Sequence, residues 1–347
     1  MNLDTINTIN DIKKMDHTQG VPVQGVFVLK KKANKKAKND STYLSLEYGD
    51  RTGNFHAFCF GDNPIYPRIE SIKEGSPVFV GLTTGVYQGR FSPRLTETRL
   101  LAEEELANPD LSSRLVETSL ENADELWEEF QSFVADIENE KLRETVRLAI
   151  DDIELGFRST PAAIAMHHAY RHGLIEHTIH MARACKALLP LYKEVDPSLA
   201  MAGLLLHDIG KVIEYEGELS VSKSRTGILQ GHVVLGYRMA RKAGMLAKLE
   251  PDLLERLEHI ILSHQGELEW GAAAMAATPE AVFVSMIDNL DARMGMVQYA
   301  LRHRSDDKPF SDYLPGLKAP LLTTPVKEPL PELDINAEDL ENSLELE

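Results

Sequence analysis

Histidine is concentrated in one stretch of this chain. Nine of its twelve histidines fall between residues 167 and 264. The central motif is the string LHDIGK at residues 206–211, in the helix predicted to begin at Asp196-Pro197. Adjacent His207 and Asp208 are costly in a buried apolar helix unless something pairs with them. A divalent cation would do so, because it binds an imidazole nitrogen and a carboxylate oxygen together.

Further candidate ligands occur at spacings that suit separate helices of one bundle. Together with the central pair, they form the set His177, His207, Asp208, His232, His264 and Asp288. Six ligands are more than one metal takes from a protein while positions stay open for water. The set therefore predicts two metals about 3.5–4 Å apart, bridged by Asp208. We expect His177, His207 and Asp288 on one metal and His232 with His264 on the other.

Other nearby residues are candidates for supporting roles. Metal-bound imidazoles need hydrogen-bonding neighbours, and supporting or substrate-facing positions are therefore expected for His167, His168, His172, His180 and Asp291. His180 lies one helical turn from His177, and we favour His177 as the ligand. Asp291 could equally form an ordinary ion pair. His259, on a different helix face from His264, is expected to be structural.

Residues 20–102 have the alternation and turn signals of β-structure. Strands are predicted at 21–31, 42–50 and 54–60, then a short helical link with Pro64 and Pro67, then a hairpin turning at Gln88-Gly89. Five strands with a link between the third and fourth are typical of an OB-fold, a five-stranded β-barrel. The string LSLEYGDRTGNFHAFCF is similar to the Asp-x-Thr-Gly hairpin common in OB-folds that bind nucleic acids.

Candidate nucleic-acid contacts lie in this β-region. The run KKKANKKAK, residues 30–38, is predicted to be a loop between the first two strands, beside the oligonucleotide face of an OB-fold. A solvated loop without a specific site is the alternative. Bases stack on aromatic rings, and Phe27, Tyr43, Tyr87 and Phe91 are the aromatic candidates, about half of which must instead be core. The expected contacts are Lys30, Lys31, Lys32, Lys35, Lys36, Tyr43, Tyr87 and Phe91.

The other segments are assigned by composition. Residues 1–19 are a polar lead-in, 103–155 an acidic helical connector, 156–303 an all-α bundle, and 304–347 an acidic, Pro-rich tail expected to be disordered. The net charge is −17, but a phosphate would feel mainly the lysine run, because screening limits the reach to about 8–10 Å. No signal-peptide pattern and no membrane-length apolar run occur. Two cysteines far apart in sequence favour the cytoplasm.

The order and spacing of the six ligands resemble the HD superfamily of metal-dependent phosphohydrolases. The strings MHHAYRHGLIEH, LLLHDIGKVIEYEGE, GHVVLGY, HIILSHQGELEWG and IDNLDARM look like the YhaM family of bacterial 3′-to-5′ exoribonucleases. Over residues 20–303 the resemblance implies a multi-domain α+β protein, with an N-terminal OB-fold and a C-terminal HD-domain helical bundle. It also implies manganese-supported removal of nucleotides from the 3′ end of single-stranded RNA, and often of single-stranded DNA. Paired histidines are expected after Leu262-Ser263, whereas this chain has His264-Gln265, so a substrate contact at 265 could differ.

The predicted chemistry is hydrolysis of a terminal phosphodiester by a centre with two divalent ions, Mn²⁺ or else Mg²⁺, Co²⁺ or Fe²⁺. Asp208 and His177 would act through the metals, and Lys211 either contacts a phosphate or is a solvated lysine. The rivals are an HD-type nucleotidase, a cyclic-dinucleotide phosphodiesterase, and a nucleic-acid-binding regulator with a vestigial metal site. No GYP tripeptide follows His264, a nucleotidase has no evident use for an OB-fold, and six intact ligands argue against a vestigial site. A homo-oligomer is left open.

Overall fold

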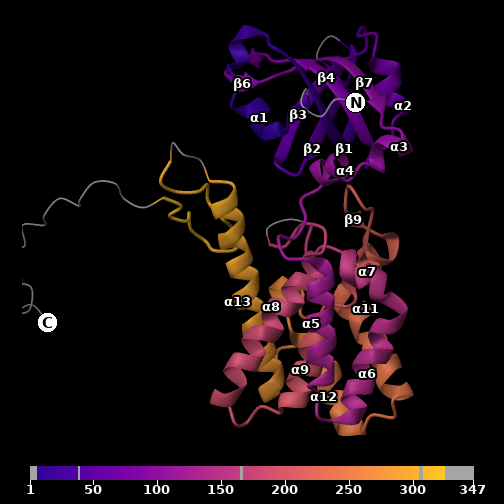
Figure 1. Cartoon of the computed structure of the whole chain (residues 1–347), viewed down its shortest axis with the longest axis vertical. Coiled ribbons are helices and arrows are strands. Elements are labelled where there is room, and N and C mark those ends of the chain that lie inside the picture. Colours follow the sequence, from indigo (N-terminus) through magenta and orange to yellow (C-terminus); the bar gives the residue numbers. More distant parts are fainter. Residues whose placement is uncertain (1–5, 38–39, 165–166, 305–307, 325–347) are drawn as a thin grey trace, which may run out of the picture. The chain divides into compact units, whose positions relative to one another are not determined.

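The computed structural model describes residues 6–37, 40–164, 167–304 and 308–324 (Figure 1). The described residues up to 292 form one compact unit and those from 293 onward a second. Within the first unit, strands dominate up to residue 100, and helices follow. Among the described residues, no helix combines the length and the apolar character needed to cross a membrane.

The strand-rich part is a five-stranded antiparallel sheet in the order β3-β2-β1-β4-β7. Its strands are β1 (Pro22–Lys36), β2 (Thr42–Asp50), β3 (Gly53–Phe60), β4 (Pro77–Thr83) and β7 (Arg94–Leu100). The edge strands β3 and β7 approach each other, and helix α2 (Tyr66–Ser71) links β3 to β4. The expected five strands and the helical link after the third are confirmed.

Strand β3 has one buried face and one exposed face. In β3, Phe55, Ala57 and Cys59 are buried, whereas the alternate side chains Phe58 and Phe60 are exposed. This period of two follows from the pleat of a strand. The short helix α1 (Ile9–Lys13) closes the buried face with two isoleucines, and its first turn is capped by Thr8.

The predicted hairpin turn is also present. Strands β5 (Val86–Tyr87) and β6 (Arg90–Phe91) pair on either side of Gln88 and Gly89. Both turn residues have positive φ, 50° and 73°, as a two-residue turn that matches strand twist requires.

The lysine run is not a loop, and that expectation was wrong. Residues as far as Lys36 continue β1 and pair with β2; Lys38 lies outside the described residues. The Nζ of Lys32 donates to the backbone oxygens of Ile69, Glu70 and Ile72 at 3.4, 2.5 and 2.5 Å, so Lys32 satisfies carbonyls at the end of α2. These partners come from a segment far along the chain, and they allow a lysine-rich sequence to extend a strand.

Helices make up the rest of the described first unit. They are α3 (Glu103–Leu106), α4 (Pro109–Leu115), α5 (Ala123–Ala135), α6 (Glu140–Ile150), α7 (Glu154–Ser159), α8 (Gly173–Leu188), α9 (Pro197–Leu206), α10 (Lys211–Glu214), α11 (Arg225–Leu246), α12 (Pro251–Ser263) and α13 (Pro279–Arg302), the last of which continues into the second unit. Short 3-10 turns join several of them, and a small hairpin, β8 (Tyr215–Glu216) with β9 (Ser222–Lys223), separates α10 from α11. The predicted helix starts at Pro197 and Pro251 are confirmed.

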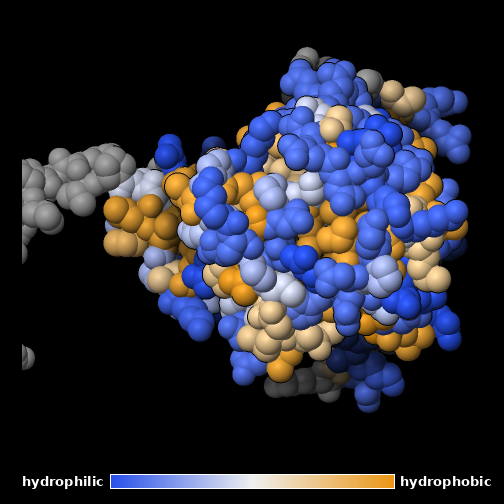
Figure 2. Space-filling model, turned by 90° about the horizontal axis from the view of Figure 1, so that it is seen from below, coloured by the Kyte–Doolittle hydropathy of each residue, from blue (hydrophilic) through white to orange (hydrophobic). Residues whose placement is uncertain are grey.

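One apolar core holds this helical body together. It runs from Leu126 in α5 to Ile287 in α13, and includes Phe130, Phe157 and Ile260. The core thus includes residues of α5 and α6, which lie in the segment 103–155. On the face seen in Figure 2, hydrophilic side chains predominate and hydrophobic ones lie among them, as is normal for a protein surface.

The expected disordered tail falls mostly outside the described residues. Within 308–324, which the structure does describe, two isolated antiparallel bridges join Phe310 to Leu322 and Leu314 to Ala319.

Candidate metal centre

The His207-Asp208 pair lies in the turn directly after α9, and the expectation that it lies inside that helix was wrong. Helix α9 ends at Leu206, His207 is its C-cap, and α10 begins at Lys211. The reason is a close approach of α11: a Cβ at Gly210 would lie 2.0 Å from the backbone oxygen of His232. Only glycine leaves room for α11 here, and the turn brings His207 and Asp208 to the region that His232 also faces.

Four histidines surround Asp208 and present Nε2 to it. His207 Nε2 and His177 Nε2 lie 3.2 and 3.7 Å from Asp208 Oδ2. His232 Nε2 and His264 Nε2 lie 3.5 Å from the other oxygen, Oδ1. Each carboxylate oxygen therefore has its own pair of imidazoles, which is the arrangement that a bridging ligand needs.

Asp288, on α13, completes the first of these groups. Its Oδ1 lies 3.3 Å from His177 Nε2. The structure thus brings the six expected ligands together, with His177, His207 and Asp288 on one side of Asp208 and His232 and His264 on the other. Four of the six, His177, His207, Asp208 and His264, are at most 2% exposed.

The second nitrogen of each histidine is already held by an acceptor. Nδ1 of His207 lies 2.6 Å from the Leu204 carbonyl oxygen, and Nδ1 of His264 lies 2.7 Å from that of Ile261. Nδ1 of His177 is 2.6 Å from Asp291, and Nδ1 of His232 is 2.8 Å from Glu214. When Nδ1 donates its proton in this way, Nε2 keeps a lone pair for a metal, and the ring orientation is fixed.

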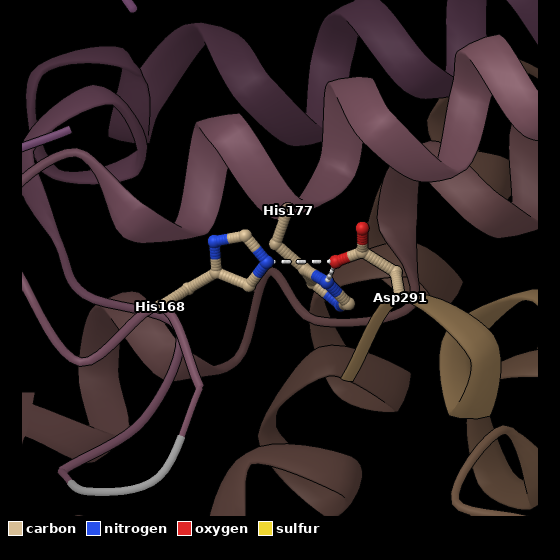
Figure 3. A group of neighbouring side chains, drawn as sticks. All are labelled: His168, His177 and Asp291. Carbon is tan, nitrogen blue, oxygen red and sulfur yellow. Dashed lines mark hydrogen bonds and ion pairs between the residues drawn. The ribbon is translucent and has the colours of Figure 1, made fainter. Parts of the chain in front are cut away.

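The carboxylate of Asp291 contacts both His168 and His177, as Figure 3 shows. Its Oδ2 contacts His168 Nε2 at 2.9 Å and His177 Nδ1 at 2.6 Å, and its Oδ1 lies 3.4 Å from His180 Nδ1. His180 Nε2 is 2.7 Å from Glu121. His180 therefore faces away from Asp208, which agrees with the choice of His177 as the ligand.

The electrostatics of this cluster favour a cation. Asp208 Oδ1 is buried and accepts no hydrogen bond within the described part of the chain. Burial by itself lowers the pKa of His177, but hydrogen bonds to Asp288 and Asp291 outweigh burial and raise it to about 10. Without a metal, Nε2 of this ring therefore carries a proton, which a bound metal would displace. Burial also acts to raise the pKa of Asp208, but the charges of Lys211 and His207 hold it well below its usual value. The donor set and the orphaned carboxylate oxygen fit divalent metals.

Lys211 is in contact with the bridging carboxylate. Its Nζ lies 2.5 Å from Asp208 Oδ2, and the side chain is buried, so the solvated-lysine alternative is wrong. An ammonium at this position is close to any phosphate that approaches Asp208.

Three other histidines lie outside this set of contacts. Nδ1 of His172 lies 2.7 Å from the Arg158 carbonyl oxygen, so this residue, expected near the metal centre, serves local structure. His259 Nε2 accepts from the Ala277 N–H at 2.8 Å, in agreement with its expected structural role. The ring of His167 lies 6.2 Å from that of His177. Burial is the main cause that lowers the pKa of His167, to about 4.

Glu214 was missed by the sequence analysis. This residue of α10 is 1% exposed, with Oε2 at 2.8 Å from His232 Nδ1 and Oε1 at 2.8 Å from Lys223 Nζ. It gives His232 the support that Asp291 gives His177. Its spacing from the histidines carries no pattern, so the sequence holds no signal for this role.

The sheet has a second candidate site, a groove of about 1040 Å³. Tyr43 and Tyr87 line it as expected, but so do Phe58 and Phe60, which are 46% and 50% exposed and were missed. The alternation that buries Phe55 places both of them on the outer face, so the sequence did hold a signal. Arg94 also lines the groove.

Several expected nucleic-acid contacts have structural surroundings instead. Phe91 packs on His17 and Phe55, with ring centroids 4.4 and 6.0 Å apart, and so belongs to the edge of the core. Phe27 is fully buried. Lys31 pairs with Glu47 at 3.4 Å, and burial lowers the pKa of Lys30. Lys35 and Lys36 are exposed, opposite Tyr43 and Thr42 in the ladder.

The fold and the site define an HD-domain protein: the HD domain family matches residues 174–293. Among relatives, the 3′-5′ exoribonuclease YhaM of Bacillus subtilis (strain 168) is 30% identical over 291 residues, 83% of this chain and 90% of that protein. That of Geobacillus sp. (strain WCH70) is 30% identical over 278 residues, 80% and 84% of the two chains. That of Listeria innocua is 27% identical over 311 residues, 87% and 95%. This chain belongs to the YhaM family of 3′-5′ exoribonucleases.

Proposed function

We propose that this protein is a metal-dependent 3′-to-5′ exoribonuclease that hydrolyses single-stranded RNA to nucleoside 5′-monophosphates. The observation that carries the proposal is the arrangement of the four histidines, each with Nδ1 held by an acceptor and Nε2 facing Asp208. Relatives that match at least 80% of this chain and carry the name exoribonuclease support the same activity.

Two divalent ions would be held by Asp208 and the five candidate ligands around it, and would supply a water of lowered pKa and charge stabilisation for the phosphoryl oxygens. The chain's own groups add the rest. Asp291 and Glu214 fix the imidazole rings of His177 and His232. The Lys211 ammonium adds one positive charge beside Asp208, where the charge on a phosphate grows during hydrolysis. We propose Mn²⁺ as the native ion.

The sheet is proposed to be an OB-fold that holds the single strand. Its strand order, the helix between β3 and β4, and the approach of β3 to β7 support that assignment. The groove offers aromatic rings for bases: Tyr43 lies 5.8 Å from Phe58 and 5.6 Å from Phe60 between ring centroids. Arg94 and Lys35 are cations for the phosphates. Single-stranded DNA would stack in the same way. Because its two cysteines are free, we place the enzyme in the cytoplasm.

The direction of attack can be read from a digest of 5′-labelled single-stranded RNA with Mn²⁺. We expect a ladder that shortens progressively from the 3′ end, with release of 5′-mononucleotides and a stop before stable duplex. The stop follows because unpairing costs about 1–2 kcal/mol per base step. A chelator should abolish the ladder.

Three outcomes would contradict the proposal. Early internal fragments would indicate an endonuclease. Labelled mononucleotide in the first samples would indicate attack from the 5′ end. Hydrolysis of free nucleotides alone would favour the nucleotidase alternative.

A further inference from the structure

The side chain of Gln265 lies beside two of the histidines of the metal centre. Its carboxamide nitrogen is 3.2 Å from His232 Nε2 and 2.9 Å from His264 Nε2. Asp208 Oδ1 lies 3.5 Å from each of the same two imidazole nitrogens. Two imidazoles, one carboxylate oxygen and one carboxamide therefore converge on one side of Asp208.

The space between these groups holds more hydrogen-bond acceptors than hydrogen-bond donors. Nδ1 of His232 and Nδ1 of His264 are held by Glu214 and by the Ile261 carbonyl oxygen, so both Nε2 atoms offer lone pairs. Asp208 Oδ1 is buried and accepts no hydrogen bond from the described residues. Such a cluster of acceptors calls for a cation.

The carboxamide can face this space with either of its two halves. Its NH₂ half donates to imidazole lone pairs, as in the structure. A cation between the same groups requires the oxygen half, and a half-turn of the amide about the Cγ–Cδ bond exchanges the two without moving the backbone.

We propose that Gln265 binds the second metal ion through its carboxamide oxygen, together with His232, His264 and Asp208. This inference rests on the proposed two-metal centre. Carboxamide and carboxylate oxygens suit Mn²⁺ and Mg²⁺, whereas imidazole nitrogens suit Zn²⁺. Gln265 therefore biases the second site toward Mn²⁺ and away from Zn²⁺. Among the described residues, the candidate ligands that Gln265 contacts are His232 and His264. Gln265 is therefore not expected to affect which metal binds at the site of His177.

Metal binding to the full-length, metal-free chain tests the proposal by isothermal titration with Mn²⁺ and, separately, Zn²⁺. The unmodified protein is expected to bind two Mn²⁺ ions. Gln265→Ala should weaken the affinity for one of them by about 10- to 100-fold and leave the other unchanged. Gln265→His should restore two-ion binding and raise the ratio of Zn²⁺ to Mn²⁺ affinity at that site. Gln131→Ala, an exposed glutamine on α5, is the matched control and should behave as the unmodified protein.

Each of the other possible outcomes would overturn one part of the proposal. Unchanged Mn²⁺ binding in Gln265→Ala would overturn the ligand role, and a raised KM for RNA in that variant would then identify Gln265 as a substrate contact. An unchanged Zn²⁺ preference in Gln265→His would overturn the selectivity. If the unmodified chain binds no Mn²⁺, the proposed metal centre itself is wrong, and the Gln265 proposal is overturned with it.

Discussion

The Asp208→Ala variant is expected to lose hydrolysis by at least about 1000-fold, because metal stabilisation is worth several kcal/mol and about 1.4 kcal/mol corresponds to tenfold in rate. Each of the two oxygens of Asp208 faces a separate pair of imidazoles. Its removal should therefore disturb both metal sites. Turnover on single-stranded RNA and metal content by elemental analysis measure the two effects, and both should fall.

Asp252→Ala is the matched control, since the Asp252 side chain is 79% exposed on α12 and only pairs with Arg256 at 3.5 Å. It should keep full metal content and full rate. The binding of single strands to the sheet should survive in both variants. Near-normal turnover by Asp208→Ala would show that the two-metal assignment is wrong.

The double variant Phe58→Ala/Phe60→Ala is expected to weaken binding of a long single-stranded RNA by about 10- to 100-fold or more, because stacking contributes about 1–3 kcal/mol per base. Both rings stand on the outer face of β3 and line the groove. Cleavage of a dinucleotide, which requires only the metal centre, should be nearly unchanged. Fluorescence anisotropy with a chelator present gives the affinity without hydrolysis.

Leu100→Ala provides the comparison for this surface. Leu100 is 54% exposed on β7 of the same sheet and is not among the groove residues. Its loss should leave RNA affinity unchanged. If the double variant slows dinucleotide cleavage as much as it weakens RNA binding, the sheet supports the active site and does not hold substrate.

The clustering of the six candidate ligands could be predicted from the sequence because each is a residue type with few other uses at such positions. A buried His-Asp pair followed by further histidines at helical spacings leaves few alternatives to a metal, and the expected division into two groups around Asp208 agrees with the distances. The spacing of Asp291 from Asp288 placed both on one face of α13 but left a supporting role and an ordinary ion pair equally open for Asp291. Its contacts with His168 and His177 come from the structure.

Other features depend on contacts that a sequence does not display. Glu214 supports His232 only because α10 and α11 pack closely at Gly210. The lysine run forms a strand because Lys32 finds the carbonyls at the end of α2. The exposure of Phe58 and Phe60, by contrast, could have been predicted from the sequence, because the alternation of residues in β3 places both aromatic rings on the face opposite Phe55.

Anomalous scattering from crystals soaked in Mn²⁺ tests the two-metal centre most directly. We expect two peaks per chain about 3.5–4 Å apart, one among His177, His207 and Asp288 and the other between His232 and His264, with Asp208 contacting both. A single peak, or two peaks that do not share Asp208, would contradict the account.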